Sequence, residues 1–247
     1  MRPYPATITP MQPDAQSKTK AVAVIVAAGQ STRMAGRDKI FAPLLGKPLL
    51  AHTLDAFHAA LQIEVIVLVL GQANLDRGET LVREYRFTKV VAICPGGAQR
   101  QDSVWNGLQR APALPFAVIH DGARPCVTPE LIDRGVEEAV RYGSAVAAVP
   151  VTDTIKVADA SGIVLSTPDR ATLWAVQTPQ VFPREALMDA YRRLKDATVT
   201  DDASVMERAG HRVHLYIGDY TNIKVTTPED MAVAEVLLQE VRQSDGS

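Results

Sequence analysis

The chain has 247 residues, of which 47% are apolar and 22% charged, a balance that excludes a disordered or fibrous protein. Its formal net charge of −2 argues against general attraction to nucleic acid or to an anionic membrane, so phosphate binding must come from locally placed arginine and lysine. Cys94 and Cys126 allow at most one disulfide and lack zinc-like spacing, which fits a reducing cytoplasm.

Residues 1–20 contain proline, glutamine, serine and lysine but no apolar core of a signal peptide or membrane anchor. We expect them to form a disordered tail. Further along, no apolar run approaches the ~18 residues of a membrane span. No repeat or linker divides residues 21–247, so we expect one domain there.

Apolar runs rich in valine and isoleucine follow, mostly without alternation of apolar and polar positions. Strands covered on both faces have this composition. Helical spacing after Pro48 and after Thr128-Pro129 places helices between the runs. The alternation predicts an α/β fold, a Rossmann-like and mostly parallel sheet flanked by helices. The predicted strands are 21–28, 63–70, 88–93, 116–120 and 144–150.

After Pro150 the pattern changes to two short strands about the turn "DASG". An isolated hairpin is marginally stable, so we expect residues of about 151–172 to project as a β-hairpin dimerisation arm of a homodimer. The chain then returns through "LWAVQTPQVF", a helix over about 184–195 and the strand "RVHLYIGD". Thr227-Pro228 opens a terminal helix.

The loop after the first predicted strand carries the first candidate site. Ligands of a parallel sheet bind beyond the carboxyl ends of its strands. Gly29 would let backbone N–H groups approach an anion, while Arg33 and Lys39 would face a polyphosphate. Neither GxxxxGK[ST] nor GxGxxG is present, which disfavours a dinucleotide-binding oxidoreductase. The alternative is a solvated basic loop.

Further motifs extend from this loop to the terminal helix. They are "AAGxSxRM…K" (27–39), "GGAQRQDSVWNGL" (96–108), "HDGARP" (120–125), "DTIK" (153–156), "TPQVF" (178–182), "TDDASVME" (200–207) and "NIKVTTPED" (222–230). The first resembles the nucleotidyltransferase superfamily, and together they resemble the 2-C-methyl-D-erythritol 4-phosphate cytidylyltransferase family. The resemblance implies a homodimeric, Mg²⁺-dependent enzyme of the non-mevalonate isoprenoid pathway, which joins CTP to 2-C-methyl-D-erythritol 4-phosphate and releases pyrophosphate.

The resemblance also implies roles for matching positions. Arg33 and Lys39 would be catalytic, stabilising charge on the triphosphate in the transition state. The implied CTP-binding residues are Ala27, Ala28, Gly29, Gly97 and Ser103. The implied residues for the second substrate are Asp121, which also lies near Mg²⁺, together with Thr154, Arg170 and Lys224. Thr154, on the arm, would reach a neighbouring subunit's site, and Arg124 would brace the "HDGARP" turn.

The residues themselves support some of these roles. Asp121 follows an apolar strand and so emerges at the ligand edge, where a hard oxygen suits Mg²⁺; alternatively it caps the following turn. Lys224 would ordinarily be solvated in a short strand, and Arg170 would ordinarily form a surface ion pair. We expect Asp201 and Asp202 to cap the next helix.

Some alternatives stay open from the sequence. Ser103 could cap a helix starting near Asp102 as well as contact a base. A related enzyme that uses ribitol 5-phosphate would share the triphosphate motifs. A non-catalytic nucleotide-sensing protein is a second rival, which intact Arg33, Lys39 and Asp121 oppose.

Overall fold

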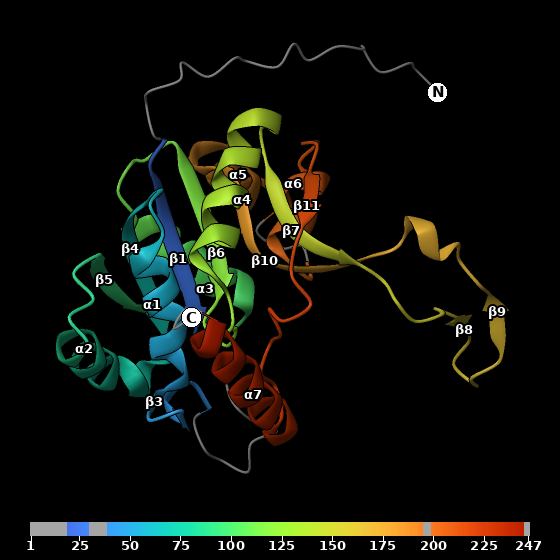
Figure 1. Cartoon of the computed structure of the whole chain (residues 1–247). Helices are drawn as coiled ribbons and strands as arrows, with labels where there is room; N and C mark the ends of the chain where they lie inside the picture. The colour runs from blue at the N-terminus through green and yellow to red at the C-terminus, as the bar shows by residue number, and fades with distance from the viewer. Residues whose placement is uncertain (1–18, 30–38, 195–198, 245–247) are drawn as a thin grey trace.

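The computed structural model describes residues 19–29, 39–194 and 199–244. In this part of the chain, seven strands form one sheet in the order β11-β7-β10-β6-β1-β4-β5 (Figure 1). The strands are β1 (Ala21–Ala27), β4 (Ile63–Leu70), β5 (Val90–Pro95), β6 (Phe116–Asp121), β7 (Ala145–Pro150), β10 (Trp174–Pro183) and β11 (His214–Ile217). The predicted α/β sheet is confirmed, with strand ends shifted by at most two residues.

All neighbouring strands are parallel except at β10, which runs antiparallel to both β6 and β7. The returning segment "LWAVQTPQVF" is therefore inserted inside the sheet between two strands that precede it in the chain. The parallel strands β1, β4, β5 and β6 end at the same edge, so the loops that follow them meet there.

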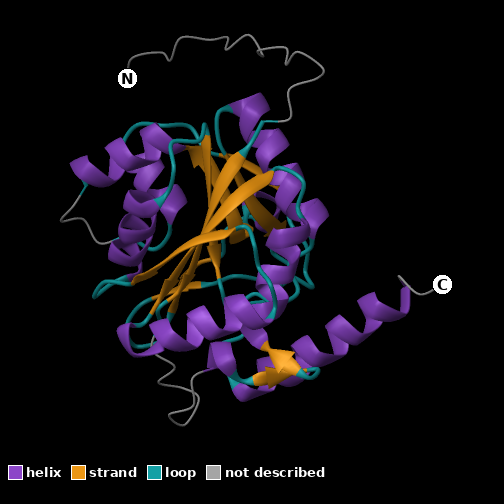
Figure 2. Cartoon of the chain, turned by 90° about the vertical axis from the view of Figure 1, so that its left-hand side faces the viewer, coloured by secondary structure: helices purple, strands orange, loops and turns teal. Residues whose placement is uncertain are grey.

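Helices cover both faces of the sheet (Figure 2), as fully apolar strands require. Alternate residues of β1 divide between two cores: Ala23 and Ile25 pack in one, Val22 and Val24 in the other. The first core is closed by α1 (Leu49–Ala59), α2 (Leu75–Glu84) and α4 (Pro129–Tyr142). The second is closed by α3 (Arg100–Arg110), α5 (Arg184–Arg193) and α6 (Asp202–Arg208).

The predicted helix starts are confirmed at several positions. The Thr128 side chain accepts a hydrogen bond from the Leu131 N–H, and Pro129 is the first residue of α4.

Terminal helix α7 (Pro228–Ser244) crosses the edge where the parallel strands end (Figure 1). There Ala234 packs with Leu49 and Val225 in a third small core, so α7 forms one wall of this edge.

A hairpin of β8 (Val157–Ala158) and β9 (Val164–Ser166) extends away from the sheet on the connection between β7 and β10 (Figure 1). Its turn is held by Asp159, whose carboxylate accepts from the N–H groups of Ser161 and Ile163, and Gly162 adopts φ of +88°. The predicted hairpin is thus present, and its use in dimerisation stays a prediction.

Residues 1–18 of the predicted tail lie outside the described residues. Lys20, at its end, donates from Nζ to the Leu61 carbonyl at 3.0 Å. Cys94 and Cys126 are buried free thiols rather than a disulfide. Among the described helices, none combines the length and apolar character needed to cross a bilayer.

Candidate functional site

A pocket of about 520 Å³ opens where the parallel strands end. It collects most of the predicted site residues, from segments far apart in the sequence. Those lining it are Ala27, Ala28, Gly29, Lys39, Gly97, Ser103, Asp121 and Lys224. Arg33 lies outside the described residues. The sequence prediction of one ligand edge for these positions is therefore supported by the geometry.

Asp121, the last residue of β6, lies among three cationic side chains. Its Oδ2 is 2.8 Å from Lys224 Nζ and 3.9 Å from Arg124 Nε, and its Oδ1 accepts from Arg100 Nε at 3.2 Å. Burial alone raises the pKa of Asp121, but Arg100 and Lys224 outweigh it and hold that pKa well below its usual range. Asp121 is therefore a permanently ionised carboxylate in the pocket wall.

The backbone of Asp121 is anchored from the neighbouring strand. The Asp121 N–H donates to Thr178 Oγ1 at 3.1 Å, which leaves the Thr178 hydroxyl to donate to His120 Nδ1 at 3.0 Å. His120 is fully buried, and burial lowers its pKa to about 3. His120 is therefore a neutral ring that packs within β6. The Asp121 carbonyl closes the "HDGARP" turn by accepting a hydrogen bond from the Arg124 N–H at 3.1 Å.

The segment around Lys224 is irregular rather than the short strand expected from the sequence. It is held against the "HDGARP" turn: Arg124 Nη1 donates to the Asn222 carbonyl at 2.6 Å, and the Val225 N–H donates to the Ala123 carbonyl at 2.8 Å. Lys39 Nζ donates to the Val225 carbonyl at 2.9 Å. Arg124 thus braces the turn as expected. Because these contacts fix the segment, the Lys224 ammonium pairs with Asp121 instead of being only solvated.

The loop before α3 forms the opposite wall. Ser103 Oγ accepts from the Gly97 N–H and donates to the Gln99 carbonyl, both at 3.1 Å. A Cβ on Gly97 would lie 2.2 Å from Asp102 Cβ, so the loop requires glycine there. The alternative role of Ser103 as helix cap is wrong, because α3 begins at Arg100 and Asp102 accepts from the Gln99 N–H at 2.9 Å.

Arg100 is a pocket residue that the sequence analysis missed. It links two carboxylates, with Nε on Asp121 and Nη1 at 2.8 Å from Asp202 Oδ2. Burial lowers its pKa, but Asp202 and Asp121 raise that pKa above the ordinary value, so the guanidinium stays charged. A signal was present, because a basic residue at a helix start opposes the helix dipole and needs an acidic partner.

The two aspartates before α6 have different roles. Asp201 caps the helix as predicted, accepting from the Ser204 N–H at 3.0 Å. Asp202 does not: its fully buried carboxylate pairs with Arg100 and accepts from the Tyr191 hydroxyl at 2.5 Å. The capping prediction is wrong for Asp202, because a buried carboxylate needs a cation more than a helix start needs a second cap.

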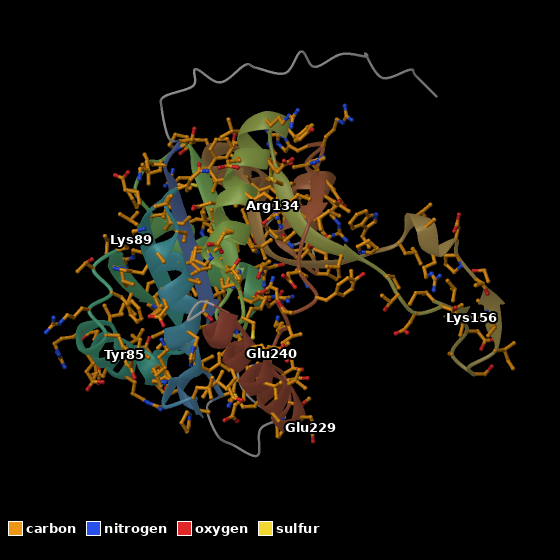
Figure 3. The ribbon with its side chains drawn as sticks, in the orientation of Figure 1. Tyr85, Lys89, Arg134, Lys156, Glu229 and Glu240 are labelled. Carbon is orange, nitrogen blue, oxygen red and sulfur yellow. The ribbon has the colours of Figure 1, made fainter. Side chains whose placement is uncertain are left out.

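Thr154 and Arg170 lie on the exposed connection to the hairpin and do not line the pocket of their own chain. Arg170 Nη1 donates to the Thr152 carbonyl at 2.7 Å. Figure 3 shows the side chains of this part, with Lys156 labelled, standing apart from the body of the protein. Their predicted position in a neighbouring subunit's site stays a prediction.

Comparison with known proteins gives one consistent result. The family profile of "IspD: 2-C-methyl-D-erythritol 4-phosphate cytidylyltransferase" matches residues 21–240. An enzyme of that name from Dehalococcoides mccartyi strain 195 is 51% identical over 90% of this chain and 98% of its own length. Another from Alkaliphilus oremlandii is 42% identical over 91% of this chain and 98% of its own.

Solved structures agree with the sequence relatives. The 4-diphosphocytidyl-2C-methyl-D-erythritol synthase of Anaerococcus prevotii superposes with a TM-score of 0.80 at 28% identity, over 90% of this chain and 97% of that one. The 2-C-methyl-D-erythritol 4-phosphate cytidylyltransferase of Thermus thermophilus gives 0.72 at 32% identity, over 87% and 98%.

Proposed function

The chain belongs to the 2-C-methyl-D-erythritol 4-phosphate cytidylyltransferase family, and we propose that it carries out this family's reaction in the pocket around Asp121. As a nucleotidyltransferase of isoprenoid biosynthesis, it transfers the cytidylyl group of CTP to 2-C-methyl-D-erythritol 4-phosphate and releases pyrophosphate. The observation that carries the proposed location is the meeting of Arg100 and Lys224 at the ionised Asp121 carboxylate, in a pocket that Lys39 also lines.

The chemistry explains why cations gather here. A phosphate oxygen of one substrate attacks the α-phosphorus of the other, so two anions must approach in line while charge develops on the departing pyrophosphate. The attacking monoester is already largely ionised near neutral pH, so no strong general base is required. Arg33 and Lys39 stabilise the triphosphate, and Lys224 holds the attacking phosphate.

The glycine-rich wall suits the nucleotide. Ala27 ends the first strand, Ala28 and Gly29 follow it, and Gly97 and Ser103 line the same pocket. Small side chains leave backbone N–H and carbonyl groups accessible, which is what recognition of a planar base by its polar edge requires. We assign the cytosine to this side and the second substrate to the side of Asp121 and Lys224.

The residues present fit Mg²⁺ as the cofactor. In the part of the chain that the structure describes, no group of three or more histidine, cysteine, aspartate or glutamate residues could hold a metal alone. Asp121 offers one ionised carboxylate, and Mg²⁺ commonly takes one or two carboxylates and completes its shell with substrate phosphates and water. When bound, Mg²⁺ would neutralise charge on the triphosphate.

The hairpin supports assembly as a homodimer with shared sites. Ile163, Val164 and Leu165 are 65%, 53% and 65% exposed on an element that has little surface of its own to bury them. We assign Thr154 and Arg170 to the pocket of the second subunit, where they hold the methylerythritol phosphate. The free, buried thiols of Cys94 and Cys126 support a reducing cytoplasm as the compartment.

Pyrophosphate release tests the proposed site. With CTP and 2-C-methyl-D-erythritol 4-phosphate, Arg33→Ala should lower kcat by about 10²-fold or more, with a smaller effect on CTP affinity. Turnover within a few-fold of the unmodified enzyme would remove Arg33 from the mechanism. Ribitol 5-phosphate serves as the control acceptor, and release with neither acceptor would favour a nucleotide sensor.

Mixing two inactive variants tests the shared site. Lys39→Met and Arg170→Met each disable a different contributor, so random heterodimers would contain one intact site out of two. Unfolding and refolding the mixture should recover about a quarter of the activity of unmodified enzyme treated alike. Recovery of none, with the dimer confirmed by sedimentation, would place Arg170 in the site of its own chain, whereas an active Arg170→Met enzyme would place Arg170 outside the site.

A further inference from the structure

A buried line of polar contacts runs from α5 to the pocket and involves four elements. The Tyr191 hydroxyl of α5 donates to Asp202 Oδ1 at the start of α6. Asp202 Oδ2 pairs with Arg100 Nη1 at the start of α3, and Arg100 Nε donates to Asp121 Oδ1 at the end of β6. Only Arg100 and Asp121 of this line face the pocket.

The Asp202 carboxylate needs a partner for each oxygen because it is completely buried and has no access to water. Each oxygen has its own partner: Tyr191 at 2.5 Å on one and Arg100 at 2.8 Å on the other. Burial and the charge of Asp202 both raise the pKa of Tyr191 well above its ordinary value, so the phenol remains a proton donor. A hydrogen bond from a hydroxyl to a buried carboxylate is a strong one.

The Tyr191 hydroxyl is not required to hold α6 in place. Gln180 of β10 already does this, accepting from the Ala203 N–H at 2.9 Å and donating to Asp201 at 3.0 Å. The ring packs beside Trp105, a contact that phenylalanine would keep. What only the hydroxyl provides is an orientation for the Asp202 carboxylate, whose terminal torsion is otherwise broad.

We propose that Tyr191 is a positioning residue for cytidylyl transfer, acting through Asp202 to hold Arg100 against Asp121. With the hydroxyl bound to Oδ1, Asp202 presents a single oxygen to Arg100, whose Nε remains available to Asp121. Without it, the carboxylate turns both oxygens toward the guanidinium in a bidentate pair and draws Arg100 away from the pocket. The inference rests on the proposed placement of the reaction beside Asp121.

The test is a double-mutant cycle with a matched tyrosine control. Tyr191→Phe should lower kcat about fivefold while the KM for either substrate changes less than about twofold, because pocket shape is kept and charge placement is lost. In an Arg100→Gln background, Tyr191→Phe should have no further effect on kcat, since its route to the site is gone. The control is Tyr216→Phe, which removes a buried hydroxyl that donates to the Leu131 carbonyl, and neither of these residues lines the pocket.

Each outcome separates this inference from the proposed site. Tyr216→Phe should lower the unfolding midpoint in urea but leave kcat unchanged. Equal losses of kcat for Tyr191→Phe with and without Arg100, or no loss at all, would reduce Tyr191 to a packing residue. Unchanged kcat in Arg100→Gln itself would instead refute the placement of the reaction beside Asp121. Asp202→Asn, which keeps the volume but weakens the pair with Arg100, should lower kcat more than Tyr191→Phe does.

Discussion

His120 should make the stability of the folded chain strongly dependent on pH. The imidazole is fully buried in β6, 4.8 Å from the Phe57 ring between centroids, and accepts from the Thr178 hydroxyl through Nδ1. Burial lowers its pKa from the ordinary value of 6.5 to about 3. The folded protein therefore excludes a proton that the unfolded chain readily accepts.

The sign and size follow from this difference. Below pH 6.5 the unfolded chain binds a proton that the folded chain refuses until pH about 3, so stability decreases as the pH falls through this window. Each unit of pKa difference corresponds to about 1.4 kcal/mol, so the full window of 3.5 units costs about 5 kcal/mol. Between pH 6.5 and 4.5 the loss is about 3 kcal/mol.

Urea unfolding of the unmodified protein and of His120→Asn between pH 7.5 and 4.5 measures this contribution. Asparagine keeps an acceptor for Thr178 but does not titrate, so the variant should be less stable at pH 7.5 and lose less stability on acidification. The exposed His211, replaced by asparagine, is the matched control and should keep the full slope. Parallel curves for the unmodified protein and His120→Asn would refute the reasoning.

Three further changes have distinct expected results. Lys224→Met should raise the KM for 2-C-methyl-D-erythritol 4-phosphate about tenfold or more and the KM for CTP less, in steady-state pyrophosphate release; an equal rise for both would contradict its assignment to the attacking phosphate. Gly107→Ala should destabilise the fold by about 1–3 kcal/mol in urea, because its Cβ would lie 2.4 Å from Val24 Cγ1 and 2.8 Å from Val69 Cγ2; a gain from helix propensity would show that α3 can shift outward. Cys126 is buried and burial raises its pKa to about 12, so iodoacetamide at pH 8 should label it only after unfolding, as mass spectrometry can determine.

Much of the fold was predictable because a strand that is buried on both faces is visible in the sequence as an apolar run. Strands such as β4, whose predicted and observed limits coincide at Ile63–Leu70, are covered by helices on either side, and all residues of β4 except Glu64 are apolar. Helix α2 shows no comparable apolar pattern in the sequence, since only Gly78 and Leu81 of its ten residues are buried. Its amphipathic face is too short to distinguish it from a loop.

The ligand edge was also predictable, because parallel strands necessarily end together. Lys39, Gly97 and Asp121 each follow or approach the end of such a strand, and the pocket gathers all three. The family motifs then indicated the chemistry that we propose for this edge. Neither step required knowledge of which side chains touch.

The pairing of the charged side chains, by contrast, was decided only by the tertiary structure. The sequence reads the same whether the side chains of Arg100 and Asp202 are solvated or paired. The two residues are about two-fifths of the chain apart, and the packing of α6 against β10 brings them together. The same holds for Lys224, which the contacts of Val225 and Asn222 turn toward Asp121. Local sequence records how apolar a segment must be, whereas the partner of a buried charge depends on which distant segments the tertiary fold places within a few ångströms.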